Sequence, residues 1–270
     1  LLFVLMILCQ FSTAKADRLR LVVGGANFRP FPVAAPSIRS ISKVKNKKHI
    51  QIQKSLTATL QNSIDIVRSL ELVSPKSYLA PEKESLTNPT YVNWINVGAS
   101  GLIKGHIELL ENSKIKLSLV FYDVISHVQL LNSSYKCNLS NCNRSIYRFV
   151  DEITKLLTGE QGILSSQISY VKRTARGKAI YISDIDGHKE RRITDPSNLS
   201  LLPAWNKNGD RIYFTSYLNN NPDLYSINLT TKKLNWISKK RGLNTGAAIS
   251  PNGKKLALTL SMDGNTEIYV

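Results

Sequence analysis

Pro203-Ala204-Trp205-Asn206-Lys207-Asn208-Gly209 returns later in the chain as Ala247-Ala248-Ile249-Ser250-Pro251-Asn252-Gly253, an interval of 44 positions (248 − 204). A period of roughly 40–45 residues, built from short alternating strands and Gly, Asn and Pro turns, is typical of a β-propeller blade. The alternative is a β-sandwich with accidental self-similarity. It is disfavoured because several landmarks keep one phase: Gly209 and Gly253, Tyr225 and Tyr269, Tyr181 and Tyr225, and Tyr170 and Phe214.

Each repeat contains four predicted strands, which in the clearest copy span 201–205, 211–217, 224–229 and 233–238. An Asn-rich turn joins the first strand to the second, and a turn ending in proline joins the second strand to the third. One period earlier, residues 168–173 fall on a second strand, so the first blade starts without its inner strand. The last residues fall in a third strand. We therefore expect an incomplete propeller in residues 166–270, with further blades and a closing strand beyond Val270.

The N-terminus has the pattern of a signal peptide that lacks its start. An apolar run over residues 1–8 precedes Ser12-Thr13-Ala14-Lys15-Ala16-Asp17, which fits an A-x-A cleavage site after Ala16. The run is too short to span a membrane, and a buried N-terminal strand is the alternative. We expect residues 1–16 to be removed and the mature protein to be exported, beginning at Asp17.

Cysteine usage agrees with export. Cys9 would leave with the signal peptide, and Cys137 and Cys142 would remain as candidates for a local disulfide. A zinc site is less favoured, because no second Cys or His pair has ligand spacing. We predict no metal and no cofactor.

The net charge of +17 is spread over clusters in predicted turns. A nucleic-acid-binding protein would show a focused basic patch with interleaved aromatic residues or a known motif, and neither is present. In an exported protein, a basic surface suits anionic envelope polymers, lipid headgroups or an acidic protein partner.

Residues 17–165 have a sequence pattern that differs from the propeller repeats. Ile52, Leu56, Leu60, Ile64 and Val67 follow the spacing of one helix face. Strands are predicted over 98–109, 115–124 and 128–136, and a second amphipathic helix over 146–157 that ends at Gly159. The pattern predicts an α/β domain with two helices on one mixed sheet, preceded by a proline-rich segment.

Several stretches together resemble the TolB family, the periplasmic component of the Tol–Pal envelope system. The most specific is the junction between the two domains; the others are blade motifs that some other propellers share. They are Asp151-Glu152-Ile153, Leu157-Thr158-Gly159-Glu160-Gln161-Gly162-Ile163, Ile168-Ser169-Tyr170-Val171, Ser183-Asp184-Ile185-Asp186-Gly187, Pro203-Ala204-Trp205 and Ser250-Pro251-Asn252-Gly253-Lys254. The resemblance covers nearly the whole chain. It implies a six-bladed propeller, no enzymatic activity and a role in binding proteins.

The resemblance implies two partner-binding surfaces. The first is an N-terminal arm over residues 17–36, which would engage a TolA-type inner-membrane protein or fold back on the protein. The strand-forming start of the arm is suited to β-augmentation, in which a segment adds a strand to a partner's sheet. The alternative is that the arm is an edge strand of the α/β sheet. The candidate contacts are Asp17, Leu19, Leu21, Val23, Phe28 and Phe31.

The second surface is one mouth of the propeller, which would bind a Pal-type lipoprotein through loops that precede inner strands. These loops are predicted at 198–203 and 242–247, one period apart, and ordinary solvated loops are the alternative. The candidate contacts are Leu199, Leu202, Leu243, Asn244 and Gly246. The implied function is a periplasmic scaffold that couples the two partners and supports envelope integrity and constriction at division.

Two other classes of protein compete with this interpretation. Prolyl-peptidase-like hydrolases carry similar propeller repeats, but they need a G-x-S-x-G elbow, and Gly98-Ala99-Ser100-Gly101-Leu102 does not match it. A secreted, glycosylated propeller is the other, since N-x-S/T sequons occur at Asn132, Asn138, Asn143, Asn198 and Asn228. A glycan on Asn198 would block the proposed mouth.

Overall fold

The computed structural model describes residues 29–41, 47–110, 114–138 and 141–270. The chain divides into two compact units, one ending at Gly162 and the other spanning Ile163–Val270. The sequence placed this boundary at 165/166. The predicted signal peptide and the arm residues Asp17, Leu19, Leu21, Val23 and Phe28 lie outside the described residues.

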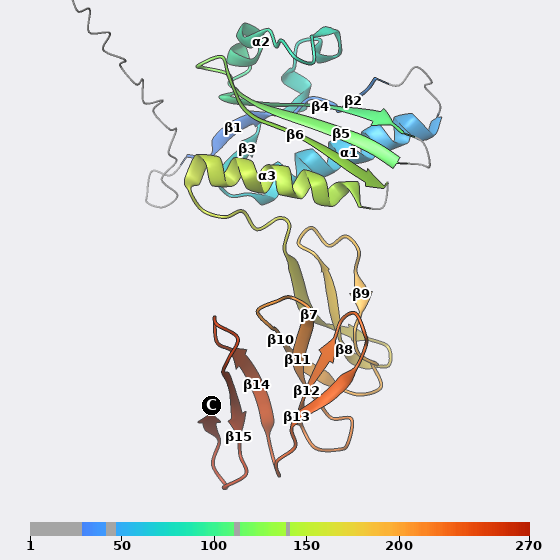
Figure 1. Cartoon of the computed structure of the whole chain (residues 1–270), viewed down its shortest axis with the longest axis vertical. Coiled ribbons are helices and arrows are strands. Elements are labelled where there is room, and N and C mark those ends of the chain that lie inside the picture. Colours follow the sequence, from blue (N-terminus) through green and yellow to red (C-terminus); the bar gives the residue numbers. More distant parts are fainter. Residues whose placement is uncertain (1–28, 42–46, 111–113, 139–140) are drawn as a thin grey trace, which may run out of the picture. The chain divides into compact units, whose positions relative to one another are not determined.

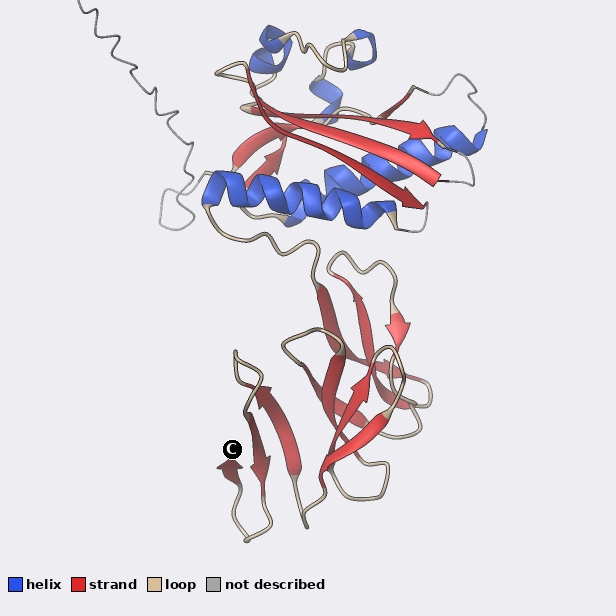
Figure 2. Ribbon diagram, viewed as in Figure 1, coloured by secondary structure: helices blue, strands red, loops and turns tan. Residues whose placement is uncertain are grey.

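The N-terminal unit is an α/β domain (Figures 1 and 2). In chain order, its described elements are β1 (Phe31–Ala34), β2 (Arg39–Ser40), α1 (Lys47–Ile66), β3 (Leu70–Leu72), the 3-10 turns η1 (Pro75–Ser77) and η2 (Pro81–Lys83), α2 (Tyr91–Asn96), β4 (Gly101–Leu109), β5 (Lys114–Asp123), β6 (Val128–Asn138) and α3 (Cys142–Thr158). The sheet order is β3-β1-β4-β5-β6, with β2 also paired to β4. β1 is parallel to both neighbours, whereas β4, β5 and β6 are antiparallel. The predicted mixed sheet is confirmed.

The two long helices lie side by side on one face of this sheet, and α2 lies on the other (Figure 1). The predicted helix stripes are the buried ones: Ile52, Leu56, Leu60 and Ile64 on α1, and Ile146, Phe149, Val150, Ile153 and Leu157 on α3. On the opposite face, Trp94 of α2 packs with Ala34, Leu102 and Tyr122. Gly159 ends α3 in the left-handed region, and its N–H donates to the Lys155 carbonyl. Its predicted C-cap role is therefore confirmed.

One part of the predicted N-terminal arm is wrong. Phe31 to Ala34 form β1, an interior strand, and Phe31 is buried. The prolines predicted an extended arm. The ladder between β1 and β4 begins only at Val33, so the missing N–H of Pro32 removes no hydrogen bond from that ladder. The Pro32 carbonyl still accepts from the Ser100 N–H at 2.9 Å. Phe31 is therefore part of the domain core and not an arm contact.

Two further differences concern the start of β4 and a short helix before it. The strand expected from residue 98 begins at Gly101, because α2 occupies Tyr91–Asn96 and Gly98 follows it with φ 81°. Helix α2 was not predicted, because it is too short to give an extended helical periodicity.

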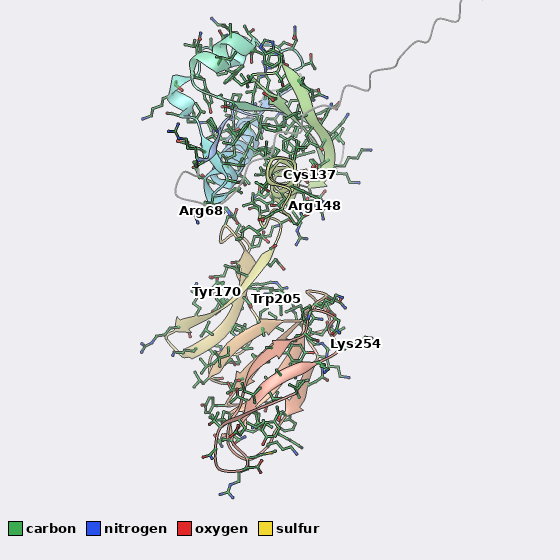
Figure 3. The ribbon with its side chains drawn as sticks, turned by 90° about the vertical axis from the view of Figure 1, so that its left-hand side faces the viewer. Arg68, Cys137, Arg148, Tyr170, Trp205 and Lys254 are labelled. Atoms are coloured by element: carbon green, nitrogen blue, oxygen red, sulfur yellow. A yellow bond between two sulfur atoms is a disulfide. The ribbon has the colours of Figure 1, made fainter. Side chains whose placement is uncertain are left out.

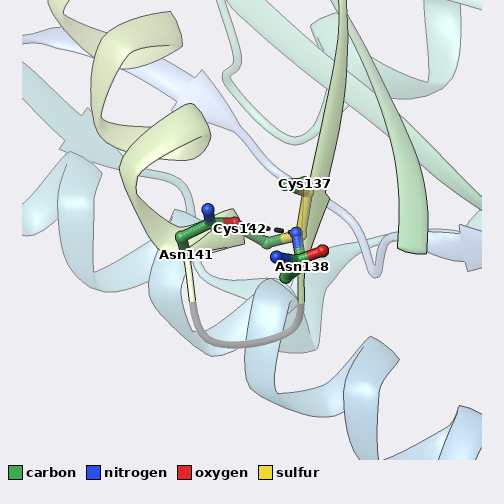
Figure 4. The surroundings of a disulfide bond; sticks show 4 residues. All are labelled: Cys137, Asn138, Asn141 and Cys142. Carbon is green, nitrogen blue, oxygen red and sulfur yellow. Dashed lines mark hydrogen bonds between the residues drawn. A yellow bond between two sulfur atoms is a disulfide. The ribbon is translucent and has the colours of Figure 1, made fainter. Parts of the chain in front are cut away.

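The predicted disulfide is present: Cys137 near the end of β6 is bonded to Cys142, the first residue of α3 (Figure 4). Both cysteines are buried. The Asn138 N–H donates to the Asn141 side-chain oxygen at 2.8 Å inside the loop that the disulfide closes. The disulfide therefore joins a sheet strand to a helix that covers the same sheet.

We expect Cys137→Ser/Cys142→Ser to lower the free energy of unfolding of the N-terminal unit by about 2 kcal/mol. The effect is modest because the closed loop is short, so little chain entropy is removed from the unfolded state. Urea unfolding of the oxidised protein against the double variant measures it. Reduction of the parent protein with dithiothreitol should reproduce the loss, and a reduced parent as stable as the oxidised one would contradict this prediction.

The C-terminal unit consists of three antiparallel sheets (Figure 2). They are β7 (Gln167–Thr174), β8 (Gly177–Asp184) and β9 (Arg191–Arg192); β10 (Ser200–Trp205), β11 (Arg211–Ser216), β12 (Asp223–Asn228) and β13 (Leu234–Ser238); and β14 (Asn244–Ile249), β15 (Leu256–Leu260) and β16 (Glu267–Tyr269). The middle sheet is the complete four-stranded blade that the sequence predicted. The 44-residue interval aligns β7 with β11, so the first sheet contains second, third and outer strands, as expected.

Stacked aromatic rings explain why the repeat keeps its phase. Tyr170 stacks on Tyr181 at 6.2 Å, and their counterparts Phe214 and Tyr225 stack at 6.1 Å. In the third sheet, the equivalent residues Leu258 and Tyr269 are direct partners in the ladder. Trp205, labelled with Tyr170 in Figure 3, packs against a core built from Ile180, Ile182, Ile212, Phe214, Tyr225 and Ile227. The landmark residues therefore mark a cross-strand pair that recurs inside each successive blade.

Candidate protein-binding surface

Four segments of the C-terminal unit meet at the entrance to its inner strands: residues 195–199, 217–222, 239–243 and 261–266. We call them the mouth rim. The Tyr217 N–H donates to the Leu199 carbonyl at 3.0 Å, and the Ser261 N–H donates to the Leu243 carbonyl at 3.2 Å. The Asn244 N–H donates to the Pro222 carbonyl at 2.9 Å and links two neighbouring sheets. Because the inner strands β10 and β14 lie side by side, these loops share one end of the unit.

Three leucines proposed as contacts are exposed at this end. The exposed fractions are 36% for Leu199, 55% for Leu202 and 37% for Leu243. Leu199 and Leu243 occupy equivalent positions one period apart, so the repeat presents the same apolar residue twice. Leu202 and Gly246 lie within β10 and β14, not in the preceding loops as the sequence analysis had placed them.

Leu202 and Gly246 are also equivalent, and both adopt left-handed backbone conformations. Their φ angles are 53° and 68°. Each lies in a β-bulge, where the register shifts between Leu201 and Ala204 and between Thr245 and Ala248. A bulge changes the direction in which its side chain points. The left-handed backbone is unfavourable for leucine but not for glycine.

Exchanging these two residues should change stability in opposite directions. We expect Gly246→Leu to destabilise the C-terminal unit by about 1 kcal/mol through left-handed strain. A Cβ atom at position 246 would contact only the Thr259 hydroxyl, at 3.6 Å, so steric crowding adds nothing to this loss of stability. Leu202→Gly should stabilise the unit by up to about 1 kcal/mol. Guanidinium unfolding of both variants tests this, and shifts of the same sign would contradict it.

The prediction of Asn244 as a contact residue is wrong, because its side chain is fully buried. Its side-chain oxygen accepts from the Ser238 hydroxyl at 2.6 Å and from the Lys240 N–H at 2.8 Å. Its amide nitrogen donates to the carbonyls of Lys240 at 2.7 Å and Gly242 at 3.0 Å. Asn244 therefore shapes the rim loop at 239–243 and has no surface to offer a partner.

The rim is bordered by basic side chains. A Cβ on Gly177 would contact the Pro196 carbonyl oxygen, which places the β7–β8 hairpin against rim segment 195–199. This hairpin and the rim loop at 239–243 carry the exposed residues Arg173, Arg176, Lys178, Lys239, Lys240 and Arg241. The pKa of Asp195 is lowered by hydrogen bonds from the Ser197 N–H and hydroxyl, and further by the charges of Arg192 and Arg176. The apolar leucines thus lie in a predominantly positive surround.

The described part of the chain contains no group of three or more His, Cys, Asp or Glu side chains arranged to hold a metal ion. Within that same part, no helix combines the length and hydrophobicity that crossing a bilayer requires.

Two family models match the chain in succession. The TolB amino-terminal domain matches residues 19–130, and the TolB beta propeller domain matches residues 154–270. The two matches follow the same order as the α/β and propeller units of the structure.

The chain belongs to the TolB family. Among its relatives is the Tol-Pal system protein TolB of Desulfosudis oleivorans, which is 28% identical over 100% of this chain and 61% of its own length. The Tol-Pal system protein TolB of Rickettsia bellii is 25% identical over 98% of this chain and 60% of its own length. This TolB-family chain therefore spans about 60% of the length of the curated relatives that it matches.

The crystal structure of TolB from Acinetobacter baumannii has the same fold. It superposes with a TM-score of 0.76 and 23% sequence identity, covering 89% of this chain and 57% of that one.

Sequence reasoning missed one polar cluster of the TolB-type N-terminal unit. Lys104 of β4 is 4% exposed and its Nζ lies 2.6 Å from Oε2 of Glu84, which is 7% exposed. In a strand, a lysine that alternates with isoleucines suggests a solvent-facing position. No local pattern indicated that residues 81–90 would cover it.

Proposed function

We propose that this chain is the part of a periplasmic, non-catalytic protein of the Tol–Pal system that binds other proteins through two surfaces. The propeller mouth binds a Pal-type peptidoglycan-associated lipoprotein. The N-terminal segment before residue 29 binds a TolA-type inner-membrane protein. By binding both partners, the protein links the inner-membrane protein to the peptidoglycan-associated lipoprotein. This link supports outer-membrane integrity and aids constriction at division.

The exposed leucines of the rim are the observation that carries this proposal. Leu199 and Leu243 repeat at equivalent positions, and Leu202 is exposed on a bulge in spite of its left-handed backbone. A strained, exposed apolar residue is a reason to suspect a binding role. Interfaces commonly place such apolar anchors inside a polar border, which matches the basic surround of the rim.

The charge of the rim favours an acidic partner surface. Attraction between opposite charges raises the association rate and suppresses wrong partners more than it adds affinity. We therefore expect binding to weaken with salt mainly through the association rate, and the leucine contacts to set the dissociation rate.

Leu199→Glu/Leu243→Glu in the natural full-length protein should weaken capture of a Pal-type lipoprotein from solubilised envelopes by at least about ten-fold. The change removes two apolar contacts and adds charge at the proposed interface. The matched control is Leu234→Glu on the outer strand β13, where the leucine is 43% exposed. Quantitative mass spectrometry of the captured proteins measures both.

Equal capture by the rim variant and the control would count against the proposed mouth. Deletion of residues 17–28 tests the other surface, and it should remove a TolA-type protein from the captured set while leaving the lipoprotein. A hydrolase activity that co-purifies with the chain in the absence of both partners would contradict the proposed function as a whole.

A further inference from the structure

The outer strand of the middle sheet, β13, has a partner strand on one side only. Within the C-terminal unit, all of which the structure describes, β13 pairs with β12 alone. The Asn228 N–H donates to the Lys233 carbonyl at 3.0 Å, which makes these two residues a bonded pair. Bonded and non-bonded pairs alternate along an antiparallel ladder. The backbone N–H and C=O groups of Leu234 and Trp236 therefore point away from β12, where an added strand could pair with them.

The exposed side chains of β13 are apolar. Leu234 and Trp236 lie on one face of the strand and are 43% and 50% exposed, and Ile237 is 37% exposed. Edge strands are often protected by a charged residue or a proline within the strand. The sequence of β13, Leu-Asn-Trp-Ile-Ser, contains neither. A register shift opposite Leu224 and Tyr225 restricts regular pairing to residues 234–236, so the edge open to an added strand is short.

Trp236 is fixed in position by its neighbours. Its ring stacks on the ring of the buried Tyr225, with the centroids 5.7 Å apart, and Nζ of Lys239 lies 4.9 Å from the Trp236 centroid. An aromatic side chain that is already ordered loses little conformational entropy on binding. Tryptophan is also among the residues that most often dominate the binding energy of an interface. The half-exposed ring of Trp236 is therefore suited to contact a partner.

Basic residues flank β13 at both ends. Residues 224–262 include seven Lys or Arg residues and no Asp or Glu. Two exposed lysines precede the strand in the turn after β12, and three exposed basic residues follow it in the mouth rim. These five residues are Lys232, Lys233, Lys239, Lys240 and Arg241. A partner that covers β13 is therefore expected to carry negative charge at both ends of the segment that binds.

The acidic residues next to β12 do not cancel this charge. Asp223 of β12 is buried, and Asp210 accepts hydrogen bonds from the side-chain amides of Asn206 and Asn228. Two carboxylates against the five flanking cations leave an excess of about +3 around the strand.

We propose that β13 is a docking edge for an extended acidic segment of another protein. The segment adds a strand beside residues 234–236, packs an apolar side chain on Trp236 and places carboxylates near the two basic clusters. A second copy of this chain does not fit the charge of the edge, because the chain itself has a net charge of +17. The docking edge is separate from Leu199 and Leu243 of the mouth rim, so it can be tested independently of the proposed mouth.

The test uses the ¹⁵N-labelled chain and the probe peptide acetyl-Asp-Glu-Val-Thr-Val-Glu-Asp-amide. We expect saturable shifts of the Leu234 and Trp236 amides and of the Trp236 indole N–H, with a dissociation constant on the order of 100 μM for so short and flexible a peptide. Hydrogen exchange at the Leu234 and Trp236 amides should slow on binding, because these N–H groups gain acceptors from the added strand.

N-methylated peptides test strand addition without changing the protein. One peptide is methylated at both valines, and the other at the threonine and both glutamates. Only one edge of an added strand faces β13, so one of the two peptides should lose binding and the other should keep it.

Two pairs of variants test the charges and the place of binding. Lys232→Gln/Lys233→Gln should weaken binding about three-fold or more. Lys254→Gln/Lys255→Gln is the matched control, because it removes the same charge from the exposed turn between β14 and β15. Leu199→Ser/Leu243→Ser should leave peptide binding unchanged. Loss of binding in that variant would place the peptide at the mouth and would overturn the docking edge without contradicting the proposed function.

Further outcomes would also overturn the proposal. They are equal effects of the two lysine pairs, unchanged exchange at Leu234 and Trp236, and equal binding of the two N-methylated peptides. Tighter binding of phosphatidylglycerol vesicles or of a single-stranded oligonucleotide than of the peptide would also overturn it, because neither ligand pairs with the backbone of a strand.

Discussion

Glu84→Ala is expected to lower the free energy of unfolding of the N-terminal unit by about 3 kcal/mol, because it leaves the buried Lys104 ammonium without its counter-charge. The Lys104 side chain is 4% exposed and the Glu84 side chain 7%. The same carboxylate accepts from Trp94 Nε1 at 3.0 Å, so the substitution also removes a bond that ties residues 81–90 to α2.

Trp94 offers a direct readout, since it is the only tryptophan before Gly162. Urea unfolding followed by fluorescence, in a background carrying Trp205→Phe and Trp236→Phe, reports the N-terminal unit alone. The matched control is Glu108→Ala, whose partner Lys116 lies 3.9 Å away with both side chains 44% exposed. An exposed pair of this kind contributes less than about 1 kcal/mol. Equal losses in the two variants would contradict the prediction.

The loss in Glu84→Ala should shrink at alkaline pH. Without Glu84, burial holds the pKa of Lys104 further below its usual 10.5. Between the folded and unfolded pKa values the unfolded state binds more protons, so stability rises with pH in that window. Replacing both residues, as Glu84→Gln/Lys104→Met, should recover most of the loss at neutral pH.

Asn244→Ala is expected to destabilise the C-terminal unit by about 2–3 kcal/mol. Its side chain makes four hydrogen bonds, to Ser238, to the Lys240 N–H and to the carbonyls of Lys240 and Gly242. Truncation removes the partner of the Ser238 hydroxyl, the Lys240 N–H and the Gly242 carbonyl, and an unsatisfied group costs about 1–3 kcal/mol before relaxation. The Lys240 carbonyl still accepts from Asn221 Nδ2 at 3.1 Å.

Two variants separate this role from a general effect of polarity. Asn244→Asp keeps both acceptor bonds but turns an oxygen toward two carbonyls, so it should be no more stable than Asn244→Ala. Ser200→Ala, at the equivalent position one period earlier, removes a hydroxyl that donates to the Asn198 carbonyl at 2.9 Å, and should cost about 1 kcal/mol. Thermal unfolding measures all three. A stable Asn244→Ala protein that lost partner binding would restore Asn244 as a contact residue.

Local pattern predicted the elements whose residues carry their own periodicity. The stripes of α1 and α3, the alternation along β5 and the strands of the middle blade follow from spacing alone, because side chains on one face must be apolar to be buried. The Cys137–Cys142 disulfide followed from proximity in sequence. Leu202 occupies the position of Gly246 in the repeat, and both residues have a left-handed backbone.

The sequence by itself determined the two-unit order, the propeller repeat, its first sheet without an inner strand, and the mixed α/β domain. Only the tertiary structure decided that Phe31 to Ala34 pair between β3 and β4, that Lys104 is covered by residues 81–90, and that Asn244 points into its own loop. The physical reason is the range of the interactions. Periodicity reports which face of an element avoids water, whereas strand neighbours and buried polar partners depend on segments far apart in the chain, and no spacing rule encodes them.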